Sequence, residues 1–352
     1  MKIISKKEDS SLFYNSWLEY QKNNITGLNY SLDIIKYYLI TNKEILISDE
    51  SFVVMGEAHD KTCLAICFLP IYREKYSYSN AVAPIASKHK YLDACFKHID
   101  KISKKHSLLT VEFSIDTCYS QYGEWRYNYL RDYGYVDCTA NNSVFYLNNS
   151  PDMLFKKFNT SSRNIIRKTL KNNAIQLKSY DFKTISLEVF DQYKKYHTIC
   201  SGRQTRSDES FLYMYQLIES SKAVLLELNY EGKPIGYLIV FLFYPYASLA
   251  SISNLPEYER EFPIYRMLYW AAIKYCSDYK IMIYGYPAGS SLADGFKSYM
   301  DLKQLEIAKY KAHMGGVRVS DYKGIKYFDD DIAIQEVNYF KDSVLESITI
   351  LD

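Results

Sequence analysis

A short polar segment in the second half of the chain carries residues suited to acid–base chemistry. His197 has an imidazole whose ordinary pKa allows proton transfer near neutral pH. Cys200 follows three residues later, but a Cys–His nucleophile needs a third group that orients the base, and none is evident in the sequence. We therefore predict His197 as a general base, and the alternative is a structural histidine.

Two arginines flank Thr205 in the same segment. Arg203 and Arg206 carry planar guanidinium groups, whose forked donors match the oxygens of a phosphate or a carboxylate. We predict that Arg203, Thr205 and Arg206 bind the substrate. The alternative is an internal salt bridge from the arginines to Asp208 or Glu209.

Other titratable side chains compete with His197 for the role of the base. They are carboxylates and phenols in the second half of the chain, namely Glu209, Tyr286, Asp294 and Tyr299. Glu209, Tyr286 and Asp294 join His197 as predicted catalytic residues.

The composition is that of a globular protein with enough residues for two domains. The 352 residues are 48% hydrophobic and 24% charged, and the formal net charge is +2. This small net charge creates no global attraction to nucleic acid or to a membrane, so such a partner would need a local patch. The 37 tyrosines reflect either a compositional bias or a surface suited to stacking on sugar rings.

Cysteine use and the absence of targeting signals favour a reducing compartment. Of the seven cysteines, Cys63 and Cys67 lie close together, but no second close pair and no histidine pair completes a metal site, so we predict none. Residues 1–11 lack the apolar segment of a signal peptide, and we expect a cytoplasmic location. The uncharged run Gly236–Pro256 approaches membrane-spanning length, but Pro245 in its middle favours two buried strands.

Hydrophobic spacing predicts alternating strands and helices along the chain. In the first half we expect a hairpin over 52–70, a helix over 90–106, a strand over 108–115, a helix over 122–133 ending at Gly134, and extended chain over 135–147. In the second half we expect strands over 174–180, 223–230, 234–244, 247–254, 281–286 and 304–310, and helices over 187–199, 207–220, 260–278 and 292–299.

Turn-forming residues near position 150 predict a domain boundary. The run Asn148–Asp152 contains Pro151, which suits the first turn of a helix, and a basic helix follows to residue 173. Arg163, Arg167 and Lys171 recur every four residues and share one face of that helix. We predict an N-terminal domain over 1–150 and a C-terminal domain over 151–352, both of mixed α/β class.

Four segments resemble the FemAB branch of the GNAT-like acyltransferase superfamily, and the resemblance covers most of the chain. They are Arg163–Asn172, Gly202–Phe211, Glu231–Gly236 and the stretch from Tyr284 to Tyr299 with its Gly-Phe-Lys ending. The resemblance implies two tandem GNAT-like domains. It also implies transfer of an acyl group, acetyl above all, from acyl-CoA to an amine or hydroxyl of an amino sugar, such as a nucleotide-linked or surface-glycan precursor.

In GNAT-like folds the acyl donor lies where two neighbouring strands part, and its phosphates sit on a helix N-terminus. By this resemblance the acyl arm would lie along Ala250–Asn254, and the phosphates near Phe262–Tyr265. The expected donor-binding residues are Ser253, Asn254, Arg260, Tyr265, Arg266 and Lys297.

Two other functions remain open from the sequence. The chain lacks both the glycine-rich pyrophosphate loop of ordinary GNAT enzymes and the long helical arm of the tRNA-dependent members. The basic face of Arg163, Arg167 and Lys171 would suit an aminoacyl-tRNA donor, as in a FemX-type peptidoglycan ligase. The third possibility is a non-catalytic binding module of the same fold.

Overall fold

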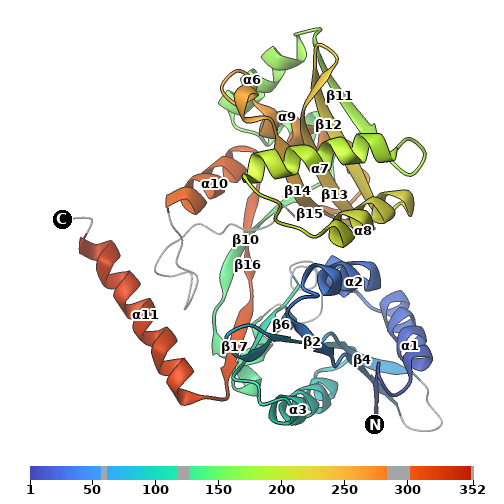
Figure 1. Ribbon diagram of the computed structural model, residues 1–352, viewed down its shortest axis with the longest axis vertical. Helices are drawn as coiled ribbons and strands as arrows, with labels where there is room; N and C mark the ends of the chain where they lie inside the picture. The colour runs from blue at the N-terminus through green and yellow to red at the C-terminus, as the bar shows by residue number, and fades with distance from the viewer. Residues whose placement is uncertain (57–61, 117–126, 284–301, 350–352) are drawn as a thin grey trace.

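Strands of the described residues form three sheets, which lie in two lobes (Figure 1). The computed structural model describes residues 1–56, 62–116, 127–283 and 302–349. Both lobes combine sheets with covering helices, which confirms the predicted mixed α/β class.

The N-terminal lobe contains two sheets with strand orders β1-β3-β4-β7 and β2-β5-β6-β8-β17-β9. Its strands are β1 (Lys2–Ser5), β2 (Leu46–Asp49), β3 (Phe52–Met55), β4 (Cys63–Cys67), β5 (Pro70–Arg73), β6 (Ser77–Val82), β7 (Ile85–Ala86), β8 (Thr110–Ser114), β9 (Val136–Asp137) and β17 (Lys323–Tyr327). Its helices are α1 (Ser10–Asn23), η1 (Leu28–Tyr30), α2 (Leu32–Thr41), α3 (His89–Lys105) and η2 (Tyr129–Tyr133). One hydrophobic core joins α1 and α3 to the strands between them.

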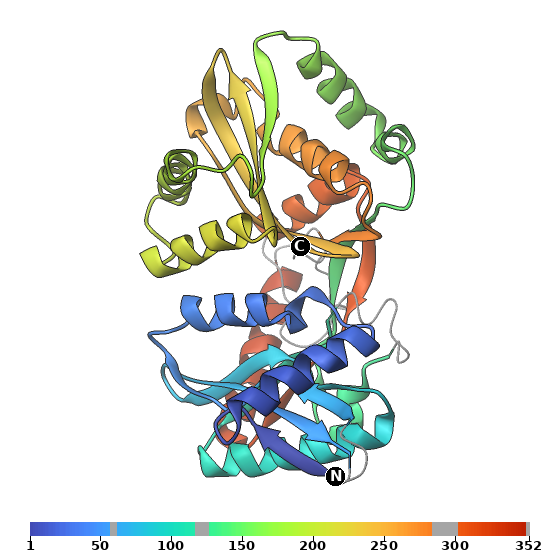
Figure 2. The same cartoon turned by 90° about the vertical axis from the view of Figure 1, so that its right-hand side faces the viewer.

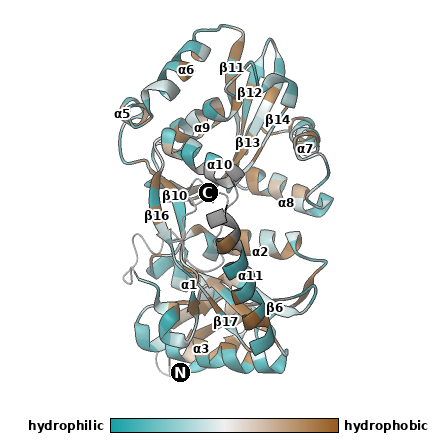
Figure 3. Ribbon diagram, turned by 90° about the vertical axis from the view of Figure 1, so that its left-hand side faces the viewer, coloured by the Kyte–Doolittle hydropathy of each residue, from teal (hydrophilic) through white to brown (hydrophobic). Residues whose placement is uncertain are grey.

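The C-terminal lobe is built on one sheet with strand order β11-β12-β13-β14-β15-β10-β16. Its strands are β10 (Ala140–Tyr146), β11 (Ile175–Tyr180), β12 (Ala223–Tyr230), β13 (Lys233–Phe243), β14 (Tyr246–Asn254), β15 (Ile281–Ile283) and β16 (Val317–Asp321). Its helices are α5 (Pro151–Lys156), α6 (Thr160–Leu170), α7 (Leu187–Ser201), α8 (Asp208–Glu219), η3 (Pro256–Tyr258), α9 (Ile264–Tyr275) and α10 (Leu302–His313). Separate cores lie on the two faces of this sheet, one under α9 and one under α7 and α8. The hydropathy colouring accordingly shows brown stretches along β12 and β13 (Figure 3).

Local sequence signals explain several of these elements. Ser207 caps α8 by accepting a hydrogen bond from the Ser210 amide at 3.2 Å. Helix α7 ends at Gly202, whose φ of 67° suits a residue without Cβ. The β12–β13 hairpin closes on Glu231 and Gly232, both with positive φ, as a tight two-residue hairpin turn requires.

The two lobes exchange strands near the predicted boundary at residue 150. Strand β10, which precedes that position, pairs with β15 and β16 in the C-terminal sheet. Strand β17, which follows β16 closely in the chain, pairs with β8 and β9 in the N-terminal sheet. The sheets are therefore linked by two chain crossings (Figure 1), while the division at residue 150 itself stays a prediction.

Helix α2 of the N-terminal lobe packs against α8 of the C-terminal lobe (Figure 2). Ile34 and Tyr37 of α2 belong to the core under α7 and α8, and the Tyr37 ring lies 5.4 Å from that of Phe241. Polar contacts surround this apolar centre, including an ion pair of 2.8 Å between Lys43 and Glu209. The lobes thus share a buried interface.

Four predicted elements differ in the structure. The basic helix expected from Pro151 to residue 173 is divided into α5 and α6, and α6 ends at Leu170. Residues 304–310, expected as a strand, lie in helix α10, because five of these seven residues are the strong helix formers Gln, Leu, Glu, Ala and Lys. The helix expected from Arg260 begins at Ile264, so Arg260 precedes it. The described end of the helix expected over 122–133 is the 3₁₀ turn η2, which ends at Gly134 as predicted. The helix expected over 292–299 lies outside the described residues.

The uncharged run Gly236–Pro256 forms most of β13, all of β14 and the turn between them. Helix α11 (Asp330–Thr349) follows β17 and lies beside the lobes (Figures 1 and 3). None of the helices in the described ranges is both long enough and apolar enough to cross a membrane.

A buried carboxylate ties the N-terminal lobe together. Glu50 is 5% exposed, and its Oε1 accepts from Lys7 Nζ at 2.6 Å and Ser48 Oγ at 2.7 Å and lies 2.9 Å from His106 Nε2. Burial opposes ionisation, but the hydrogen bonds from Lys7 and Ser48 and the nearby positive charges lower the pKa of Glu50 to about 2. The bonds join the loop after β1, the end of β2 and the end of α3.

We predict that Glu50→Gln lowers the free energy of unfolding at pH 7 by about 2 kcal/mol, because an amide accepts these charged donors less strongly. The folded pKa lies below the ordinary value of 4.5, so the stabilisation is complete above that pH and is lost as pH falls towards 2. Urea unfolding from pH 7 to pH 3 should therefore show the difference shrinking. Glu44→Gln, at an exposed position, is the control. A difference that is absent at pH 7 or grows in acid would contradict this role.

Candidate functional site

Among the described residues, strand β14 in the middle of the C-terminal sheet is paired along only part of its β15 side. It pairs with β13 along its length, but its parallel pairing with β15 covers only Tyr246–Ser248. The register with β13 shifts between Ile239, opposite Ser251, and Val240, opposite Leu249, which leaves Ala250 as an extra residue. Among the described residues, the segment from Leu249 to Asn254 therefore has no strand partner on the β15 side.

Helix α9 begins shortly after this edge. The residue before its first turn is Pro263, which makes no side-chain capping bond. The first-turn amides and the helix dipole therefore form a region that favours anions. Tyr265, in this first turn, donates its hydroxyl to Asn254 Oδ1 at 3.0 Å, and so connects the helix start to the end of β14.

Asn254 is fully buried and is held by three neighbours. Its Oδ1 accepts from Tyr265 and from the Cys200 thiol at 3.3 Å, and its Nδ2 donates to Glu259 Oε1 at 2.7 Å. Burial raises the pKa of the Tyr265 phenol, so it remains a donor. The predicted donor-binding residues Asn254 and Tyr265 are thus in direct contact, and Cys200 is engaged with Asn254 rather than with His197.

A second polar cluster surrounds His197 on the α7 side of β14. Arg206 hydrogen-bonds His197 Nε2 and also reaches Ser251 Oγ at 3.3 Å and the Tyr37 hydroxyl at 3.1 Å. Tyr193 donates to the same Ser251 Oγ at 2.7 Å. The cluster therefore joins α2, α7, β14 and the loop before α8.

The arginine determines the protonation of the imidazole. An arginine only donates, so His197 Nε2 must accept and the remaining ring proton lies on Nδ1. Burial and the neighbouring Arg206 charge lower the pKa of His197 to about 4, so the ring is neutral at pH 7. Its Nδ1 is buried and has no hydrogen-bond partner among the described residues. In this arrangement His197 offers a buried N–H donor.

Ser253, between these two clusters on β14, is fully buried, and its Oγ has no hydrogen-bond partner within the described part of the chain. Arg266, in the first turn of α9, places its guanidinium 4.9 Å from the centre of the Tyr310 ring. Both predicted donor-binding residues thus lie close in sequence to the open end of β14 and to the start of α9.

Other predicted site residues lie apart from these clusters. Arg203 and Thr205 are exposed in the loop before α8, and Arg260 is exposed before α9. Glu209 is 51% exposed and forms the ion pair with Lys43. Tyr286, Asp294, Tyr299 and Lys297 lie outside the described residues, so their roles stay predictions.

The basic face of α6 is largely engaged inside the lobe. Arg163 donates to the carbonyl oxygens of Lys156 and Phe158, and Arg167 lies 5.2 Å from the centre of the Phe155 ring. Lys171 follows the last helical residue and is exposed. Two of the three cations of the predicted basic face, Arg163 and Arg167, thus have intramolecular partners.

Sequence reasoning missed Tyr37, Tyr193 and Ser251, which complete the His197 cluster. Tyr37 lies 160 residues before His197, and no local motif indicates their contact. The sequence did contain a signal for Ser251, since it lies in the strand segment assigned to the acyl donor.

Comparisons with solved structures identify the fold. The crystal structure of FemX is similar with a TM-score of 0.67 and 11% identity, over 94% of this chain and 98% of that chain. L-PGS from Bacillus licheniformis gives 0.58 and 10%, over 93% and 95%. A tandem GNAT protein from the clavulanic acid biosynthesis pathway gives 0.52 and 11%, over 93% and 98%.

No protein-family model and no curated protein matches the sequence. The structural likeness nevertheless extends over nearly the whole chain in each of these three cases. The protein therefore has a fold similar to that of FemX and of the tandem GNAT protein, which confirms the predicted architecture. Because these identities are low, they establish the fold alone.

The His197 cluster yields a prediction for NMR. Because burial and the Arg206 charge both disfavour the imidazolium, the wild-type His197 ring should titrate near pH 4 with its proton on Nδ1. Arg206→Gln removes the charge and should raise this pKa towards 6.5, with burial still holding it below that value. The measurement is a pH series of ¹⁵N–¹H spectra of the imidazoles.

Arg203→Gln is the matched control, because Arg203 is exposed in the same loop. It should leave the His197 titration unchanged. A wild-type midpoint near pH 6.5, or an Arg206→Gln midpoint equal to the wild-type one, would contradict the assigned contact.

Proposed function

We propose that this protein is an acyltransferase that takes an acyl group, acetyl above all, from acyl-CoA. The observation that carries the proposal is the edge of β14 after Ser248, which has no partner on the β15 side among the described residues and contains the extra residue Ala250. The uncapped start of α9 follows shortly after this edge. An open edge supplies backbone amides for the acyl and pantetheine groups, and the helix start favours the phosphates. Ser253, Asn254, Tyr265, Arg266, Arg260 and Lys297 are the proposed donor-binding residues.

The acceptor is an amine or hydroxyl, and we favour that of an amino sugar in a nucleotide-linked or surface-glycan precursor. Arg203 and Thr205 are exposed and available to such a molecule. Arg206 is already engaged with His197 and Ser251, so its proposed contribution is to hold the site together as well as to contact the acceptor.

Proton removal from the acceptor is proposed to involve His197, Glu209, Tyr286 or Asp294. Of the two that the structure describes, Glu209 is paired with Lys43 on the surface and His197 is buried beside β14. With Arg206 on Nε2, His197 can stabilise negative charge through Nδ1–H, and it can act as a base only after that contact opens.

Transfer from aminoacyl-tRNA is the second candidate function, and the fold similarity to FemX is compatible with it. FemX-type ligases use such a donor, and the fold does not distinguish between the two donors. Against it stand the net charge of +2 and the intramolecular contacts of Arg163 and Arg167.

Titration calorimetry of the full-length protein with acetyl-CoA tests the proposal, with free coenzyme A and bulk tRNA as parallel ligands. We expect saturable binding of acetyl-CoA with a Kd on the order of micromolar. Salt-sensitive tRNA binding without acetyl-CoA binding would transfer the proposal to the aminoacyl ligase, and binding of none of the three would contradict both.

Reversing the charge of Arg260 tests where the phosphates of acetyl-CoA bind. Arg260→Glu, beside the start of α9, should weaken acetyl-CoA binding by roughly five- to tenfold, because it replaces an attractive charge by a repulsive one. Arg318→Glu makes the same change at an exposed position of β16 and is the control. Equal affinities of the two variants would place the phosphates elsewhere.

A further inference from the structure

Two adjoining cavities lie on the N-terminal lobe, away from the residues that the sequence singled out. The first has a volume of about 300 Å³ and lies among η1, α2, β6 and the end of β8, and the second has about 260 Å³. Tyr78 and Asn80 of β6 line both cavities. Volumes near 300 Å³ are typical of small-ligand sites, which begin at about that size.

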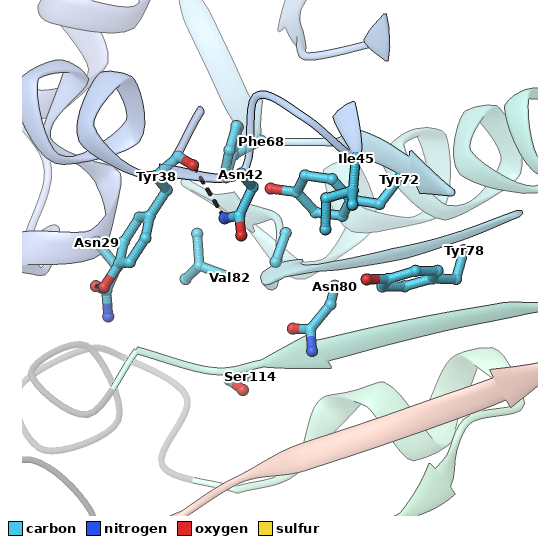
Figure 4. A pocket seen from close by; sticks show the side chains of 11 residues that line it. Asn29, Tyr38, Asn42, Ile45, Phe68, Tyr72, Tyr78, Asn80, Val82 and Ser114 are labelled. Atoms are coloured by element: carbon cyan, nitrogen blue, oxygen red, sulfur yellow. Dashed lines mark hydrogen bonds between the residues drawn. The ribbon is translucent and has the colours of Figure 1, made fainter. Parts of the chain in front are cut away.

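The first cavity is polar but uncharged. Its hydrogen-bonding side chains are carboxamides, phenols and one serine hydroxyl: Asn29, Asn42, Asn80, Tyr38, Tyr72, Tyr78 and Ser114. In Figure 4 the Tyr72 hydroxyl points towards Asn42 and the Tyr78 hydroxyl towards Asn80. Asn42 is held in place by its donation to the Tyr38 carbonyl at 2.9 Å. None of the described residues that line this cavity is charged.

Aromatic rings continue from the first cavity into the second. The Tyr72 and Tyr78 rings are 5.7 Å apart, and the Tyr78 and Tyr76 rings are 6.0 Å apart. Tyr72 lines the first cavity, Tyr76 lines the second, and Tyr78 stands between them. Such a row can pack against the C–H faces of successive rings in a chain, while amides bind their hydroxyl groups.

Charge excludes the main alternative occupants. A phosphodiester chain would need cations along its path, but the second cavity adds Glu74 and Glu112 against the single Lys75. A neutral polar chain has no such requirement.

The first cavity also lies close to the proposed transfer site. Asn29 belongs to η1, which contacts β14. Tyr38 neighbours Tyr37, whose hydroxyl is bonded to Arg206. A chain seated on β6 would therefore enter the first cavity at the end nearest the open strand, and the second cavity would hold its next unit.

We propose that these cavities bind an uncharged oligosaccharide of at least two sugar rings, one in each cavity, with Tyr78 and Asn80 between them. The inference rests on the proposed acyltransfer for its purpose, since it makes the acceptor a glycan chain. Binding itself needs no acyl donor.

The test measures binding to the full-length protein without acetyl-CoA, by calorimetry and saturation-transfer NMR. The probes are N,N′-diacetylchitobiose, cellobiose and maltose, each beside its monosaccharide, and uridine. We expect at least one disaccharide to bind about tenfold or more tightly than its monosaccharide and than uridine, because it fills both cavities.

Variants locate the site. Tyr78→Ala should weaken the preferred disaccharide by about tenfold, and Tyr78→Phe should retain most of the affinity because the ring remains. Asn80 is exposed, so Asn80→Ala should fold normally and weaken binding by roughly fivefold. Tyr339→Ala, which removes a ring that is 77% exposed on α11, is the control and should have no effect.

The proposal is overturned if no disaccharide binds, if uridine binds as tightly as the preferred disaccharide, or if Asn80→Ala and Tyr78→Ala retain full affinity. These results are independent of acetyl-CoA binding. If acetyl-CoA binds but no disaccharide does, the glycan site alone is wrong. If a disaccharide binds but acetyl-CoA does not, the proposed acyl donor alone is wrong.

Discussion

The guanidinium of Arg206 is the point on which the candidate site depends. A partly buried positive charge is tolerated only where acceptors meet it, and here they come from α2, α7 and β14. The contact fixes the tautomer of His197, engages Ser251 on the open strand and ties the N-terminal lobe to the C-terminal lobe through Tyr37. One side chain thus couples the position of α2, which borders the polar cavity, to the strand proposed to hold the acyl donor.

This coupling gives the two lobes distinct parts in one proposed reaction. The C-terminal lobe supplies a helix start and, among the described residues, a strand edge without a partner beyond Ser248, which suit an extended donor with anionic groups. The N-terminal lobe supplies uncharged amides and phenols, which suit a neutral polar ring. The strand exchange through β10 and β17 and the α2–α8 contact hold these surfaces in a fixed relation.

The sequence predicted elements whose signals are local. The Gly134 end of η2 and the adjacent strands β13 and β14 follow from residues a few positions apart. The prediction of a strand over 304–310 is wrong, because most residues of this stretch favour a helix and the structure places them in α10.

The candidate site was predictable only in part. His197, Arg206 and Asn254 were identified by residue type and by their place in the expected fold. Tyr37 and the cavity of Asn29, Tyr38 and Asn80 were not, because they reach the site through tertiary packing between distant segments. The same limit applies to β17, whose pairing with β8 across about 210 residues leaves no trace in the local pattern.

Hydrogen exchange in the presence of saturating acetyl-CoA tests the central claim most directly. The account predicts that backbone amides of residues 249–266 gain protection, since they contain both the open edge of β14 and the start of α9, while residues 77–82 of β6 do not change. Protection confined to the N-terminal lobe, or no protection in 249–266 when binding is saturated, would contradict the proposed position of the donor.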